Sequence, residues 1–175
     1  MPLTLVLGGA RSGKSAYAEN VAVLSQKPVV YMATAKIQDE AIQARVKLHQ
    51  VRRPESWITV ESPLQLAQAL QQQDAPAVTI LVDCLTMWVT NLLCEEDSQL
   101  LESEIQAFLS VLSTLEGEII LVSNEVGMGI IPMGKLTRDY VDLAGKLHQQ
   151  VAAQADNVVL VTAGLPLAFK GSVKS

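Results

Sequence analysis

The segment Gly8-Gly9-Ala10-Arg11-Ser12-Gly13-Lys14-Ser15 matches the pattern G-x-x-x-x-G-K-[ST] at every position. An apolar run that begins at Leu3 precedes it, and residues typical of a helix follow it from Ser15. Glycines in such a loop let backbone N–H groups converge on phosphate oxygens, because no Cβ stands in the way. The start of a helix adds a partial positive charge. The sequence therefore predicts a phosphate-binding loop, and with it a nucleoside triphosphate as ligand.

The metal ion that accompanies a bound triphosphate needs oxygen ligands. We expect Lys14 to reach the β- and γ-phosphates and Ser15 to ligate Mg²⁺ through its hydroxyl. Asp83 ends the apolar run 79–82, and we predict that its carboxylate holds Mg²⁺ through a water. The alternative for Asp83 is to cap a helix that starts near Leu85.

Length and composition bound the class of protein. A chain of 175 residues and 18.9 kDa predicts one nucleotide-binding domain, 1–175. Hydrophobic residues make up 49% and charged residues 18%, which excludes an intrinsically disordered protein. Cys84 and Cys94 lack the spacing of a redox or zinc motif, and we interpret them as reduced thiols of a cytosolic protein.

The charge balance limits the partners. The formal net charge is −5 and no basic tract occurs, which argues against nucleic acid as the main partner. No apolar run approaches the roughly 18 residues of a membrane span. The first residues lack a basic leader and run into the glycine-rich loop, so we interpret them as a strand and not as a signal peptide. These features predict a soluble, cytoplasmic protein.

Five short apolar runs rich in β-branched residues alternate with longer helical stretches. The runs are 3–7, 29–33, 78–82, 119–123 and 158–162. Strands that are apolar on both faces are typical of a parallel sheet. Apolar residues at spacings of three and four predict helices within 100–115 and 136–151, while 71–77 and 95–99 are interpreted as connections. This alternation predicts an α/β three-layer sandwich with a mostly parallel sheet.

Ligands in such sheets bind beyond the carboxyl ends of the strands. Polar residues and glycines gather after these ends, at 34–36, 83–86, 124–129 and 163–166. We therefore expect the chemistry at this edge, with Thr34 and Lys36 lining the nucleotide site.

The chain has two histidines, which differ in their surroundings. His148 lies beside the apolar stripe of its helix but off it, and we interpret it as a surface or boundary residue. His49 lies in 45–53, the densest positive charge in an acidic protein. The spacing alone leaves two interpretations of His49 open, a solvated basic helix end and a functional histidine.

Motifs from one end of the chain to the other resemble a single family. They are 8–15, 31–35, 45–49, 53–54, Trp57, 83–86, 88–93, 123–132, 138–139, 144–145 and 161–166. The most distinctive are Ser-Asn-Glu-Val-Gly-Met-Gly-Ile-Ile-Pro at 123–132 and the segment that joins His49 to Arg53-Pro54 and Trp57. In these motifs the chain resembles the bifunctional adenosylcobinamide kinase / adenosylcobinamide-phosphate guanylyltransferase family of cobalamin biosynthesis.

The resemblance implies two reactions on a RecA-like P-loop scaffold. In one, a nucleoside triphosphate, ATP or GTP, phosphorylates a hydroxyl of adenosylcobinamide. In the other, GTP guanylylates a histidine, which falls on His49, and GMP moves to adenosylcobinamide phosphate to give adenosyl-GDP-cobinamide. Family members can carry a second histidine where Leu48 stands, but the nucleophile is the following position. Lys14, Mg²⁺ and a cation such as Arg45 or Arg53 would stabilise the phosphoryl charge.

The resemblance also implies a homo-oligomer, with a trimer favoured, and extends the candidate site. The candidate nucleotide-binding residues are Gly8, Gly9, Ala10, Arg11, Ser12, Gly13, Lys14, Ser15, Thr34, Lys36, Arg53, Glu61 and Asp83. Glu125 is a candidate to orient Mg²⁺, a hydroxyl or the substrate, or else forms an ion pair or a helix start. Gly127 and Gly129 are expected to let their loop approach nucleotide or corrinoid. Trp57 and Trp88 are interpreted as packing residues.

Two other functions remain open on the sequence. The first is a plain small-molecule kinase that uses Lys14, Ser15 and Asp83 while His49 is structural. The second is a nucleotide-dependent switch or motor, against which the acidic charge without a basic stripe argues.

Overall fold

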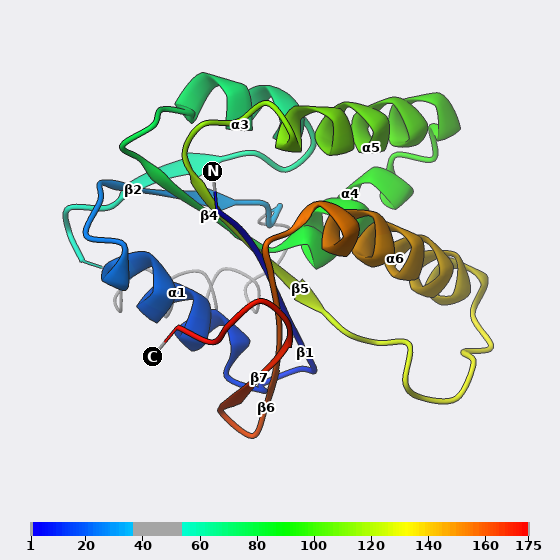
Figure 1. The fold of residues 1–175 in the computed structure, drawn as a ribbon. Coiled ribbons are helices and arrows are strands. Elements are labelled where there is room, and N and C mark those ends of the chain that lie inside the picture. The colour runs from blue at the N-terminus through cyan, green and yellow to red at the C-terminus, as the bar shows by residue number, and fades with distance from the viewer. Residues whose placement is uncertain (1, 37–53, 175) are drawn as a thin grey trace.

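The computed structural model describes residues 2–36 and 54–174, and within them the chain forms a seven-stranded sheet with helices on both faces (Figure 1). The strands are β1 (Leu3–Gly8), β2 (Val29–Ala33), β3 (Ile58–Glu61), β4 (Thr79–Asp83), β5 (Glu118–Asn124), β6 (Asn157–Thr162) and β7 (Leu165–Lys170). The helices are α1 (Lys14–Leu24), α3 (Leu66–Gln73), α4 (Leu85–Cys94), α5 (Ser98–Leu112) and α6 (Lys135–Gln154).

The strand order is β3-β2-β4-β5-β1-β6-β7, and every pair except β6–β7 is parallel. The five strands expected from the apolar runs are β1, β2, β4, β5 and β6, so these predictions and the mostly parallel sheet are confirmed. β1 lies between β5 and β6, and it delivers the phosphate loop to the middle of the carboxyl edge.

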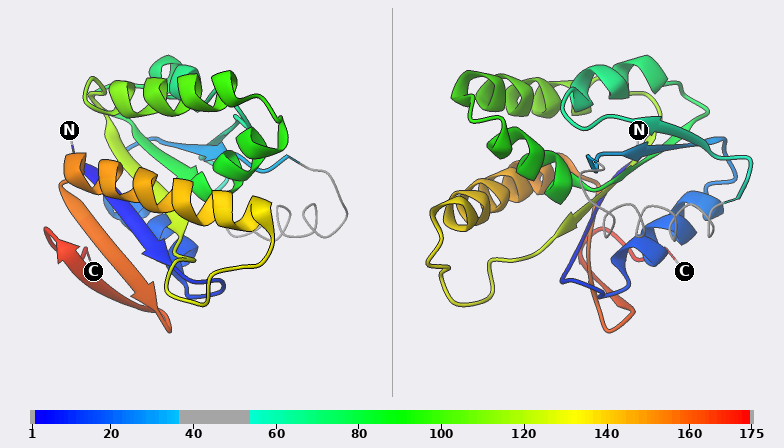
Figure 2. Two further views of the ribbon diagram at one scale, coloured as in Figure 1. Left: turned by 90° about the vertical axis from the view of Figure 1, so that its right-hand side faces the viewer. Right: turned by 180° about the vertical axis from the view of Figure 1, so that it is seen from behind.

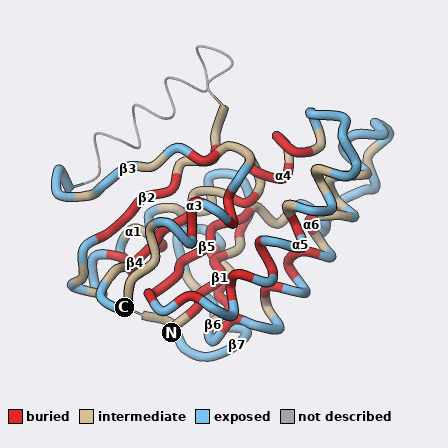
Figure 3. The backbone as a smooth tube through the Cα atoms, turned by 90° about the horizontal axis from the view of Figure 1, so that it is seen from above, coloured by how far each residue is buried: buried red, intermediate tan, exposed pale blue. Residues whose placement is uncertain are grey.

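The strands are apolar throughout because both faces of the sheet are covered. Ile119 and Leu121 of β5 pack into the cluster under α3, α4, α5 and α6. Ile120 and Val122, which alternate with them, pack into the cluster under α1 (Figure 2). Figure 3 shows the resulting buried residues along the central strands. This explains why the period of two that marks a half-exposed strand is missing from the sequence.

Both tryptophans pack against the hydrophobic clusters, as expected. Trp88 is fully buried, its indole Nε1 donates to the carbonyl oxygen of Leu64 (2.7 Å), and its ring centroid lies 4.9 Å from that of Phe108. Trp57 is partly buried against the cluster under α1.

The edge strands β3 and β7 were not expected from the sequence, and neither was α3. β3 has four residues and most of them are exposed, so its pattern lacks the apolar run of a central strand. β7 includes Pro166 and follows β6 through a two-residue turn, Ala163-Gly164, with φ of 53° and 78°. Both turn residues are left-handed, which is the geometry of a tight antiparallel hairpin. Residues 71–73 belong to α3, and Ser98 begins α5, so the expected connections are shorter than predicted.

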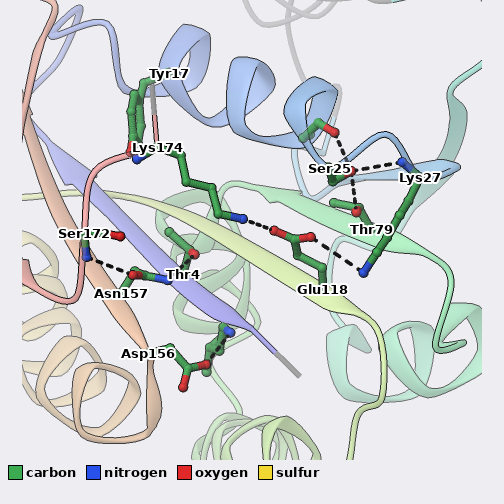
Figure 4. A network of polar contacts seen from close by, with 12 residues as sticks. Thr4, Tyr17, Ser25, Lys27, Thr79, Glu118, Asp156, Asn157, Ser172 and Lys174 are labelled. Carbon is green, nitrogen blue, oxygen red and sulfur yellow. Dashed lines mark hydrogen bonds and ion pairs between the residues drawn. The ribbon is translucent and has the colours of Figure 1, made fainter.

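At the amino edge of the sheet, charged side chains pair with one another (Figure 4). Glu118 is 4% exposed and accepts from the ammonium of Lys174 (2.5 Å), with the ammonium of Lys27 at 3.7 Å. The backbone N–H of Lys174 donates to Tyr17 Oη of α1 (3.2 Å). The segment after β7 is therefore fixed beneath the helix that follows the phosphate loop.

The described helices include none that is both long enough and apolar enough to cross a membrane.

Candidate functional site

The phosphate loop joins β1 to α1, and its glycines are required by geometry. Gly13 caps α1 with φ of 96°, a left-handed conformation, and α1 begins at Lys14. A Cβ on Gly13 would lie 3.1 Å from Gly164 Cα, and a Cβ on Gly8 would lie 2.6 Å from the carbonyl oxygen of Val161. Side chains at these two positions would therefore force the loop away from β6.

Neighbouring strands hold the loop from both sides. The backbone N–H of Gly164 donates to the carbonyl oxygen of Ser12 (2.8 Å), and that of Glu125 donates to the carbonyl oxygen of Gly8 (3.0 Å). The Ser12 hydroxyl is enclosed and has no hydrogen-bond partner among the described residues. A buried polar group without a partner is costly. This hydroxyl lies against Gly8, where an added Cβ would be 2.4 Å from it.

The ammonium of Lys14 lies over the loop and donates to the carbonyl oxygen of Gly9 (3.3 Å). This bond is exposed, so a phosphate can replace it at little cost. Arg11, with φ of 56°, is exposed at the outer side of the loop.

Asp83 lies at the carboxyl end of β4 and accepts a hydrogen bond from Tyr31 Oη (3.0 Å). Burial, with the Asp83 carboxylate beside it, raises the pKa of the Cys84 thiol to about 11, while the charge of Lys14 opposes the shift. Lys14 begins α1 after β1 and Asp83 ends β4; β5 pairs in parallel with both strands, so the fold brings the two residues to one edge of the sheet. The N-cap of α4 is Cys84, which excludes the alternative that Asp83 caps this helix.

The donor set fits Mg²⁺. Asp83 and Ser15 offer one carboxylate and one hydroxyl, and Mg²⁺ binds through few protein oxygens together with waters and substrate phosphates. No cluster of three or more His, Cys, Asp or Glu side chains suited to a metal occurs within 2–36 and 54–174, so a closed cage of protein ligands is absent there.

Three other predicted nucleotide-binding residues lie at the ends of β2 and β3. Thr34 is fully buried, and its hydroxyl donates to the carbonyl oxygen of Cys84 (2.7 Å) and accepts from the Cys84 N–H (2.9 Å). The ammonium of Lys36 pairs with the carboxylate of Glu95. Glu61 is exposed at the end of β3. Thr34 thus ties the end of β2 to that of β4, and nucleotide contact by these three residues stays a prediction.

Two predicted site residues, His49 and Arg53, lie outside the described residues, as does Arg45. Their proposed roles rest on the sequence.

The end of β5 adds a residue that the sequence analysis did not single out. Asn124 pairs in register with Gly8, and its backbone N–H donates to Thr86 Oγ1 (2.8 Å). Its Oδ1 atom is buried and has no hydrogen-bond partner among the described residues. An amide whose oxygen has no partner, beside the phosphate loop, is a candidate ligand contact. The available signal was its place between an apolar strand and Glu125.

The interpretation of His148 as a surface or boundary residue was wrong. His148 is 8% exposed, and its Nε2 atom lies 2.7 Å from Ser123 Oγ. Its Nδ1 atom lies 3.9 Å from Glu125 Oε2. Burial lowers the pKa of His148, and the Glu125 carboxylate opposes the shift. The buried face of α6 is wider than the stripe of apolar residues, because it covers polar groups at the end of β5.

The loop after Glu125 is anchored at both ends and exposes apolar side chains between them. The N–H of Gly127 donates to Glu125 Oε1 (2.6 Å), and the guanidinium of Arg138 donates to the carbonyl oxygens of Pro132 (3.1 Å) and Met133. The exposed apolar residues of the loop are Val126, Met128, Ile130, Ile131 and Met133, and the exposed Leu136 follows in the first turn of α6. A Cβ on Gly129 would meet nothing within 4 Å, so packing among the described residues does not require a glycine at this position.

The arrangement of strands and helices is that of P-loop NTPases. The RadB recombinase superimposes with a TM-score of 0.53 at 18% identity, covering 91% of this chain and 73% of that one. An ATPase of a bacterial type III secretion system superimposes with a TM-score of 0.53 at 10% identity, covering 95% and 56%. At these identities the similarity shows the fold alone, and it confirms the expected RecA-like architecture.

Comparison with known sequences shows which family the chain is similar to. A bifunctional adenosylcobalamin biosynthesis protein CobP of Pseudomonas aeruginosa is 49% identical over 167 residues, which cover 95% of this chain and 96% of that protein. Proteins named CobU, with the same description, are 39% identical in Escherichia coli and 38% in Salmonella typhimurium, each covering 96% of this chain and 99% of the relative. A model of cobinamide kinase / cobinamide phosphate guanyltransferase matches residues 4–169. The chain belongs to the cobinamide kinase / cobinamide phosphate guanyltransferase family.

Proposed function

We propose that the protein catalyses two consecutive reactions, phosphorylation of adenosylcobinamide and transfer of GMP from GTP to adenosylcobinamide phosphate. The observation that carries this proposal is a complete phosphate loop at the carboxyl edge of the sheet, where Asp83 also ends a strand, in a chain of this family. The product of the second reaction is adenosyl-GDP-cobinamide, and pyrophosphate is released.

In the kinase reaction the substrate hydroxyl oxygen forms a bond to the γ-phosphorus while the bond to the β–γ bridging oxygen breaks. Lys14 exchanges its bond to the Gly9 carbonyl for the β- and γ-phosphate oxygens, and the loop N–H groups bind the same oxygens. Ser15 and Asp83 would hold Mg²⁺, which supplies neutralisation of phosphate charge when bound. The protein thus contributes positioning and positive charge.

In the transferase reaction a nitrogen of His49 attacks the α-phosphorus of GTP, and pyrophosphate leaves. A phosphate oxygen of adenosylcobinamide phosphate then attacks the same phosphorus, and the bond to His49 breaks. Two displacements replace one difficult transfer. The support is the sequence around His49, where Arg45 and Arg53 are the candidate cations for the phosphoryl oxygens.

A labelling experiment tests the covalent step. The wild-type protein incubated with [α-³²P]GTP should retain acid-labile label after denaturation, and [γ-³²P]GTP should leave none. His49→Ala should abolish the α-label, while the neighbouring Gln50→Ala should keep it. If His49→Ala is labelled like the wild type, the histidine proposal is wrong. If neither the wild type nor any variant is labelled but the wild type phosphorylates cobinamide, the protein is a plain small-molecule kinase.

We also propose a cytoplasmic homotrimer. The exposed apolar side chains of Ile130, Ile131 and Met133 support an assembly, because a neighbouring copy would remove them from water. Sedimentation equilibrium should give three times the chain mass. A monomer at micromolar concentration would contradict the proposal.

A further inference from the structure

Three side chains form a polar cluster behind the phosphate loop. Ser123 and Glu125 lie at the carboxyl end of β5, and His148 reaches them from α6. The His148 Nε2 atom lies 2.7 Å from Ser123 Oγ, and its Nδ1 atom lies 3.9 Å from Glu125 Oε2. The proposed kinase and transferase roles assign no function to His148 or Ser123.

The backbone places Glu125 beside the phosphate loop. Its N–H donates to the carbonyl oxygen of Gly8, the first residue of the phosphate loop (3.0 Å). The Oε1 atom accepts from the Gly127 N–H (2.6 Å), which fixes one side of the carboxylate. The Glu125 side chain is 24% exposed, so the carboxylate lies at the boundary between the interior and the space in front of the loop. The carboxylate is therefore partly accessible to solvent.

The imidazole of His148 is arranged to fix the other carboxylate oxygen. Neutral imidazole carries one N–H and one acceptor nitrogen. When Nε2 accepts from the Ser123 hydroxyl, the N–H is on Nδ1 and faces Glu125 Oε2. The 3.9 Å between these atoms exceeds hydrogen-bond length, so the hydrogen bond would form only if the two side chains approached each other.

We propose that Glu125 is the general base of the kinase reaction and that His148, oriented by Ser123, is a positioning residue that aims its carboxylate. This inference rests on the proposed kinase function. As the substrate oxygen bonds to the γ-phosphorus, its proton moves to a Glu125 oxygen, and the nucleoside diphosphate departs with the electron pair of the broken P–O bond. The proton is released to solvent from Glu125 after product leaves.

The experiment measures cobinamide phosphorylation at pH 7.5 with wild type and four variants. Glu125→Gln keeps the size of the side chain and the acceptor for Gly127 but cannot take a proton, so kcat should fall by ~10²–10⁴-fold while KM for the nucleotide stays within a factor of about two. His148→Leu should lower kcat about tenfold, again without a change in nucleotide KM. His148→Asn, whose amide can replace the Nδ1 donor, should restore most of this loss. Gln149→Ala, exposed on the next position of α6, is the matched control and should equal the wild type.

Three results would overturn the inference: Glu125→Gln within about twofold of wild type in kcat, equal losses in His148→Asn and His148→Leu, or a loss confined to nucleotide KM. If His148→Leu does not fold, His148→Asn is compared with Ser123→Ala instead. Each of these variants keeps a donor toward Glu125 but loses the contact between Ser123 and the imidazole. The kcat of both should then lie between that of the wild type and that of Glu125→Gln. Labelling of His49 by [α-³²P]GTP is measured in parallel and should persist in every folded variant. Wild-type protein that fails to phosphorylate cobinamide refutes the proposed function itself, which distinguishes the two failures.

Discussion

The backbone N–H of Gly164 donates a hydrogen bond to the carbonyl oxygen of Ser12, with an N···O distance of 2.8 Å. The turn of the β6–β7 hairpin therefore supports the phosphate loop from behind. The hairpin turn also lies close to Gly13, because a Cβ on Gly13 would lie 3.1 Å from Gly164 Cα. The geometry of the catalytic loop thus depends on a hairpin more than 150 positions away in the chain.

Gly13→Ala tests this dependence. The substituted residue must keep φ near 96° and push against Gly164, so we expect a loss of about 1–3 kcal/mol in the free energy of unfolding and a higher KM for nucleotide. The matched control is Gly145→Ala, in the interior of α6, where a Cβ meets nothing within 4 Å. That change should stabilise the protein by roughly 0.5–1 kcal/mol. Urea unfolding measures both, and equal effects of the two substitutions would contradict the argument.

Lys14→Met should remove kinase activity while leaving the fold intact. The Lys14 ammonium makes an exposed bond to the Gly9 carbonyl, so its loss costs little stability, but phosphate charge then lacks its partner. We expect kcat to fall by more than about 10²-fold, in line with other electrostatic stabilisers. Lys146→Met, exposed on α6, is the control. Circular dichroism melts and steady-state phosphorylation would separate the two effects, and wild-type activity in Lys14→Met would refute the assignment.

The stability of the protein should decrease in mild acid through His148. Burial lowers the pKa of His148 in the folded state relative to about 6.5 in the unfolded chain. The unfolded state therefore binds the proton more tightly, so stability conferred by this group is complete above pH 6.5 and is lost as the pH falls through and below that value. His148→Asn, which does not titrate, should show a flatter dependence between pH 7.5 and 5. Urea midpoints at several pH values measure this, and parallel curves for both proteins would contradict it.

The two thiols should differ in reactivity. Burial and the Asp83 carboxylate raise the pKa of Cys84 to about 11, whereas Cys94 is exposed at the end of α4. The thiolate is the reactive form, so at pH 8 a disulfide reagent should modify Cys94 quickly and Cys84 slowly. Cys94→Ser should lose the fast phase. A fast phase that survives this substitution would show that Cys84 is accessible and ionised.

The central strands and the phosphate loop were predictable because their signals are local. A complete eight-residue motif follows β1, and apolar runs mark the strands covered on both faces. The edge strands were missed for the converse reason. β3 and β7 are exposed on one side, and Pro166 within β7 argues against a central strand, so neither carries such a run.

The main charged residues of the site were predictable from the sequence, but the contacts between its side chains were not. Lys14 and Asp83 follow from motif and strand end. The burial of His148 does not, because it depends on α6 lying over the end of β5, a packing that no local spacing reveals. Thr34 shows the same limit, since its position after β2 says nothing of the Cys84 backbone that engages its hydroxyl.

The contrast between Glu118 and Asn124, at opposite ends of β5, bears on how this protein can be engineered. Glu118 has two lysine partners at the amino edge, whereas Asn124 Oδ1 has none among the described residues. Improved pairing at the amino edge would raise thermal tolerance at no expense to turnover. The same kind of improvement around Asn124 would give its Oδ1 atom an internal partner and so remove a candidate ligand contact. Searches for more stable variants should therefore vary residues at the amino edge of the sheet and keep those at its carboxyl edge unchanged.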